Sequence, residues 1–90
     1  MKECKCRFLM EYKNFRVSQI RQNIHDINDF ILITESETDR QYRIAILEKQ
    51  IDRIEKYYNA CRYGLISVNE CMYELAAIGS YHDPDYYDIP

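Results

Sequence analysis

The sequence predicts an all-α protein built on a long antiparallel, coiled-coil-like helical hairpin. Apolar residues in two separate stretches recur at alternating spacings of three and four, which is the period of a helix that buries one face. The chain also holds only two glycines and two prolines among 90 residues, too few turn residues for a many-stranded sandwich or barrel. This length allows one domain. We expect it to span residues 1–79, followed by an acidic, tyrosine-rich tail at 80–90.

The clearest pattern predicts a helix over residues 38–63. Its seam residues keep heptad spacing for three repeats, and charged residues lie between them. The seam residues are Ile44, Leu47, Ile51, Ile54, Tyr58, Cys61 and Leu65. Two capping boxes, Thr34 with Glu37 and Thr38 with Gln41, are candidates for its start, and Gly64 for its end.

A first helix over 8–33 and a third over 68–78 complete the prediction. The first shows the same rhythm in Val17, Ile20, Ile24, Ile27 and Ile31. In an antiparallel pair, Ile24 would face Ile51 and Ile20 would face Ile54. The third helix begins with the capping box of Ser67 and Glu70 and is closed by Gly79. It is long enough to cover only one end of the hairpin.

Both long helices carry apolar residues on a second face as well. A helix that is apolar on two faces needs a second cover, and an identical chain is the simplest one. We therefore expect a homodimer. The expected interface residues are Phe8, Tyr12, Phe15, Tyr42, Ile46 and Tyr57.

Charge is distributed unevenly along the chain. The net charge is -3, but residues 1–21 hold six bases and two acids, whereas residues 63–90 hold five acids and no base. Acids interleaved with tyrosines suit a basic groove on another protein, because the charges are complementary and tyrosine is a common interface anchor. The expected partner-binding residues are Glu70, Glu74, Tyr81, Asp83, Asp85, Tyr86, Tyr87 and Asp88.

These features favour a small, non-enzymatic protein-binding module. The abundance of Ile, Tyr, Asn and Asp, with few Ala and Gly, is typical of AT-rich bacterial or phage genomes. A phage or mobile-element inhibitor that occupies a host protein's surface, as an acidic mimic of nucleic acid, is the concrete form of this hypothesis.

Two alternatives remain open. The first is a nucleic-acid-binding regulator, because bases of the first helix interleave with Phe8, Tyr12 and Phe15. The second is an adaptor stapled by zinc, with Cys4, Cys6 and Cys71 as candidate ligands. The paired C-x-x-C spacing of strong zinc motifs is missing, so we expect no metal and no cofactor.

The sequence shows no motif for catalysis. Neither histidine is placed against a nucleophile by the pattern, and two glycines fifteen residues apart cannot form a phosphate-binding loop. The longest apolar runs have four residues, far short of a membrane span. We therefore expect a cytoplasmic protein that does not associate with membranes.

Overall fold

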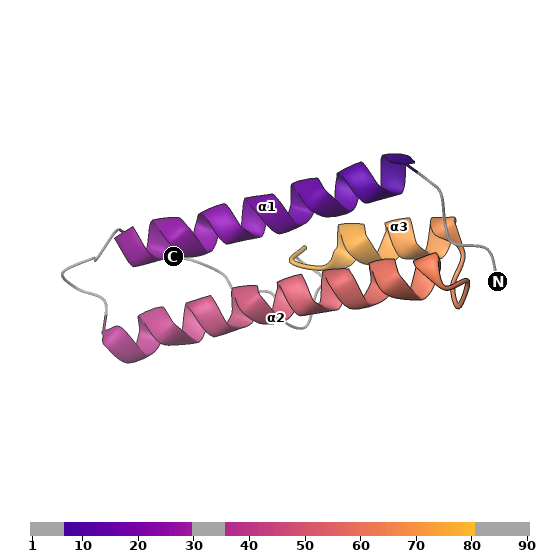
Figure 1. Ribbon diagram of the computed structural model, residues 1–90. Coiled ribbons are helices and arrows are strands. Elements are labelled where there is room, and N and C mark those ends of the chain that lie inside the picture. The colour runs from indigo at the N-terminus through magenta and orange to yellow at the C-terminus, as the bar shows by residue number, and fades with distance from the viewer. Residues whose placement is uncertain (1–6, 30–35, 81–90) are drawn as a thin grey trace.

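The computed structural model describes residues 7–29 and 36–80, which form three helices. These are α1 (Arg7–Asp29), α2 (Glu37–Arg62) and α3 (Val68–Ala77). No strand occurs within the described residues, so the all-α prediction is confirmed. α1 and α2 lie side by side and run in opposite directions, and α3 turns back along the carboxyl-terminal half of α2 (Figure 1). α3 packs mainly on α2 and also contacts α1.

The main core lies where all three helices meet. Leu9 from α1, Ile54 from α2 and Leu75 from α3 are completely buried there. Every helix contributes apolar residues to this cluster, which consists of Leu9, Val17, Ile20, Ile51, Ile54, Cys61, Cys71, Leu75 and Ile78. Ile27 of α1 and Ile44 of α2 are also buried but do not belong to this cluster. The third helix therefore thickens the core at one end of the α1–α2 pair.

The amino end of α2 is capped by Ser36. Its hydroxyl accepts a hydrogen bond from the Asp39 backbone N–H at 3.1 Å. The capping box predicted for Thr38 with Gln41 is therefore wrong, because Thr38 lies within the first turn of α2. Thr34, from the other predicted capping box, lies outside the described residues. Hydrogen bonds from Arg40 and Gln41 hold the pKa of Glu37, the first residue of α2, below its ordinary value of 4.5. A carboxylate at this position also suits the positive end of the helix dipole.

The carboxyl end of α2 explains why one predicted seam residue is not buried. The Gly64 N–H bonds to the Cys61 carbonyl at 2.9 Å and the Leu65 N–H to the Ala60 carbonyl at 2.8 Å. Gly64 has a φ of 78°. Together these features form a Schellman motif, which turns the chain out of the helix. The predicted seam position of Leu65 is therefore wrong, and its side chain is 72% exposed.

The start of α3 follows the prediction closely. The Ser67 hydroxyl accepts a hydrogen bond from the Glu70 N–H at 3.0 Å, as expected for an N-cap. The predicted bounds of α2 and α3 agree with the observed ones to within one residue, as does the start of α1. The predicted end of the first helix, at residue 33, lies outside the described residues. Of the helices described, none combines the length and the apolarity needed to cross a membrane.

Candidate protein-binding surfaces

Arg16 joins α1 to the carboxyl end of α3. Its guanidinium donates one hydrogen bond to the Leu75 carbonyl at 3.1 Å and a second to the Ile78 carbonyl. Carbonyls at the end of a helix lack donors from the next turn, and a cation there also stabilises the helix dipole. Arg16 is therefore a clamp on α3, although the sequence pattern placed it on a solvated or phosphate-binding face.

Gly79 completes this junction directly after α3. Its φ of 79° lies in the left-handed region. A Cβ atom at this position would lie 3.1 Å from Oε1 of Gln50 and 3.4 Å from Nη2 of Arg16. Gln50 belongs to α2 and is buried, so the junction brings residues of α1 and α2 against the end of α3. The point at which the chain leaves α3 is thereby held in place.

Other bases of α1 also face their own chain. The ammonium of Lys13 lies 5.2 Å from the centre of the Tyr58 ring, close enough for a cation–π contact. Nη2 of Arg21 lies 4.0 Å from Oε1 of Glu55 on α2. Arg16, which binds α3, is therefore occupied within its own chain.

The core of α1 contains a residue that the sequence pattern missed. Leu9 is fully buried, and its spacing to Lys13, Arg16 and Ile20 continues the rhythm of the apolar seam. This spacing can be read in the sequence, but the bases Lys13 and Arg16 interrupt the apolar pattern. Both bases occupy packing positions: Arg16 donates to a backbone carbonyl of α3, and Lys13 lies over the ring of Tyr58 on α2.

The residues expected to form a dimer interface fall into two groups. Tyr12 and Tyr57 pack against the chain's own core. Ile46 is half-buried, whereas Phe8, Phe15 and Tyr42 are exposed by 60% or more. Phe8 and Phe15 are two turns apart on the same side of α1 and form an exposed aromatic pair.

The outer side of α3 carries an acidic face, defined here as Glu70, Tyr73 and Glu74. Glu70 is exposed, Glu74 is half-buried, and Tyr73 is 73% exposed. α3 contains no base. Behind this face, Cys71 and Leu75 are completely buried. The other expected partner-binding residues lie outside the described residues; they are Tyr81, Asp83, Asp85, Tyr86, Tyr87 and Asp88.

The described cysteines are part of the core. Cys61 and Cys71 are buried, and the Cys71 thiol donates a hydrogen bond to the Tyr57 carbonyl with an S···O distance of 3.5 Å. Within residues 7–29 and 36–80, no group of three or more His, Cys, Asp or Glu side chains could hold a metal ion. The remaining candidate ligands, Cys4 and Cys6, lie outside the described residues.

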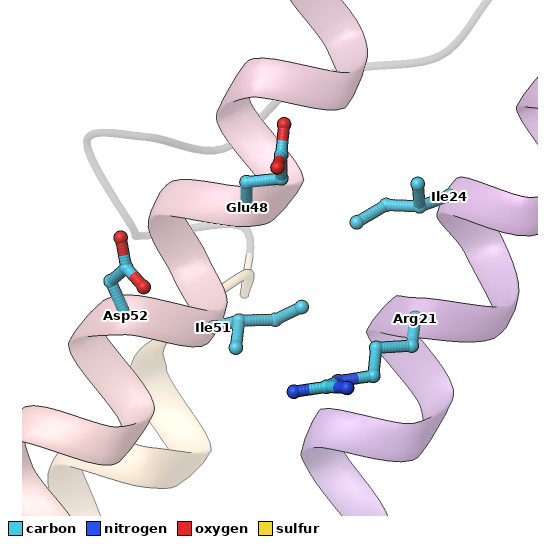
Figure 2. A pocket seen from close by; sticks show the side chains of 5 residues that line it. All are labelled: Arg21, Ile24, Glu48, Ile51 and Asp52. Carbon is cyan, nitrogen blue, oxygen red and sulfur yellow. The ribbon is translucent and has the colours of Figure 1, made fainter.

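A shallow groove separates α1 from α2. Figure 2 shows Ile24 and Ile51 pointing toward one another from the two helices, with Arg21 on the α1 side. Glu48 and Asp52 line the α2 side. Apolar residues inside and charged residues at the rim are typical of the seam between two packed helices.

No protein-family model, no curated protein and no solved structure matches this chain.

Proposed function

We propose that this chain is a small, non-enzymatic module that binds the basic surface of another protein in the cytoplasm. The observation that supports this most directly is the acidic face of α3. It presents an exposed tyrosine between two carboxylates on a helix without bases. Complementary charge speeds and orients association, and tyrosine supplies contact area with few rotatable bonds to immobilise.

The acidic face is held rigidly enough to serve as a binding surface. A helix of ten residues is unstable alone in water, so α3 depends on its packing. Ser67 caps its amino end, Arg16 binds its carboxyl end, and Leu75 anchors its inner side. A surface that is ordered before binding loses less entropy when a partner docks.

The more specific form of the proposal concerns the kind of partner. Carboxylates spaced along a helix, beside a flat aromatic ring, resemble the charge and stacking surface of nucleic acid. We propose an inhibitor or regulator of phage or mobile-element type that occupies a host protein's nucleic-acid-binding groove. The acids of residues 81–90 add to the same charge. A homodimer built on a coiled-coil-like hairpin, with Phe8 and Phe15 at the contact, belongs to the same proposal.

The test compares two double variants that change charge and aromatic area equally. Glu70→Lys with Tyr73→Ser alters the acidic face, and Glu48→Lys with Tyr63→Ser alters exposed residues elsewhere on the molecule. Each protein is used to capture partners from host lysate, followed by quantitative mass spectrometry and by affinity measurement with the purified partner.

We expect the variant of the acidic face to lose at least tenfold in affinity and the control variant to retain it. We also expect nucleic acid to compete with the chain for the partner. Equal binding by both variants would contradict the proposal, and so would a partner without a basic surface. Circular dichroism of each variant establishes that the helices are intact.

A further inference from the structure

The exposed aromatic pair of α1 borders α3. Arg16 donates hydrogen bonds to carbonyls at the end of α3, whereas Arg21 reaches toward Glu55 of α2. These two bases point in directions about 140° apart around α1, so they mark the sides on which its two neighbours lie. Phe8 and Phe15 are closer to Arg16 than to Arg21 around the helix. The pair therefore lies on the side of α1 next to α3.

One line of α3 faces the same side. α1 and α3 run in the same direction (Figure 1). Both are right-handed helices, so the line of Val68, Met72 and Ala76 turns toward α1, and the carboxylates of the acidic face turn toward α2. Phe8 is level with the start of α3, because Arg16, about two turns later, binds the end of α3.

α1 and α3 thus share an apolar surface, called here the α1–α3 face. It consists of Phe8, Tyr12, Phe15, Val68, Met72 and Ala76. Tyr12 and Met72 are half-buried against the core and form its floor. The phenylalanines, 65% and 61% exposed, form a ridge on the α1 side. The α3 side carries two smaller exposed residues, Val68 and Ala76.

The α1–α3 face is complementary to a copy of itself. The two phenylalanines of the ridge are about 10 Å apart along α1, and Val68 and Ala76 are about 12 Å apart along α3. A two-fold axis can therefore lay the ridge of each copy on the smaller residues of the other. Such a contact sets identical faces together, so charges on the face would meet their like. None of the six residues is charged, and Glu11 borders the ridge on the side away from α3.

We propose that a second copy of this chain docks on the α1–α3 face, with its aromatic ridge against Val68 and Ala76. This contact rests on the homodimer proposed above and adds α3 to it. The two phenylalanines offer about 200–300 Å² of exposed surface, and an interface of standard size buries about 800 Å² per partner. The contact is therefore small, and the dimer should dissociate reversibly on dilution.

The contact leaves the acidic carboxylates available to another protein. Glu70 and Glu74 lie on the line of α3 that turns away from α1. α3 thus serves self-association with one flank and partner binding with the other. A dimer presents two acidic faces, so it should bind a densely immobilised partner more tightly than a monomer does.

The experiment introduces the same charge inside and outside the α1–α3 face. Ala76→Lys places an ammonium in the contact, and the matched control, Ala45→Lys, alters an exposed alanine on α2. A lysine in the last turn of α3 also suits the helix dipole, so the helix should stay intact. Sedimentation velocity over a dilution series measures the dissociation constant of the dimer. We expect Ala76→Lys to raise it by at least about tenfold, because an ammonium buried without a partner is costly, and Ala45→Lys to leave it unchanged.

Val68→Glu repeats the test at the other end of the face. An acid in the first turn of α3 suits the helix dipole, and circular dichroism checks the helices of both variants. The inference is overturned if Ala76→Lys and Val68→Glu both dimerise like the original chain. Loss of the dimer from Phe8→Ser with Phe15→Ser alone would then leave the ridge in the contact and remove α3 from it. A chain that is monomeric at every concentration overturns both this inference and the homodimer. Partner binding is measured with the acidic-face variants, so its failure is seen separately.

Discussion

Arg16 shows that a charged residue can occupy a packing position when its acceptors come from another element. It lies in the line of the α1 seam, which also holds the buried residues Leu9 and Ile20. Its two hydrogen bonds reach carbonyls about 60 residues away in sequence, at the end of α3. The same reasoning applies to Lys13 on the ring of Tyr58. Both bases therefore contribute to the fold before any partner is involved.

At this scale we predict that Arg16→Met destabilises the protein by about 1–3 kcal/mol. Methionine keeps the apolar stem but leaves the Leu75 and Ile78 carbonyls without their donor. Arg21→Met is the control, because the Arg21 side chain is 67% exposed and its ion pair is long. Urea unfolding of both variants measures the difference. Equal free energies of unfolding would show that Arg16 does not hold α3.

α2 shows how far a heptad pattern extends. Its seam is buried at Ile44, Ile51 and Ile54, as the spacing predicts. The pattern formally continues to Leu65, but the helix ends at Arg62 and the Schellman motif at Gly64 redirects the chain. Heptad spacing predicts burial only for residues within the helix, and Leu65 lies after its end. Glycine at C′ was the more reliable of the two sequence signals.

At the scale of the element we predict opposite outcomes for two residues that share the same heptad pattern. Ile54→Ala should destabilise the protein by about 2–5 kcal/mol, because a fully buried side chain is replaced by a cavity. Leu65→Ala should change the free energy of unfolding by less than about 0.5 kcal/mol, because the side chain is exposed. Denaturant unfolding measures both. A large loss from Leu65→Ala would place that residue in an interface.

The whole molecule is asymmetric along its length. α3 thickens one end to three helices, and the described residues at the other end belong to α1 and α2 (Figure 1). The aromatic pair Phe8 and Phe15 is exposed at the three-helix end, although the main hydrophobic core lies in the same part of the molecule. Exposed aromatic side chains two turns apart are typical of a contact surface.

At this scale we predict a dimer of twice the 10.9 kDa chain mass at micromolar concentration. Light scattering after size exclusion measures the mass as the protein is diluted. Phe8→Ser with Phe15→Ser should shift the equilibrium toward monomer, whereas Tyr63→Ser, a control at an exposed turn residue, should not. A monomer at all concentrations, with both variants identical to the original chain, would contradict self-association through this pair.

Helix positions and several of their caps followed from local information. The spacing of Ile51 and Ile54, the hydroxyl of Ser67 and the backbone freedom of Gly64 act within a few residues, and each is legible in the sequence. The burial of Gln50 and the clamp by Arg16 were decided by tertiary structure. Whether a polar side chain is buried depends on acceptors that packing brings from distant elements, and helical period carries no information about those acceptors.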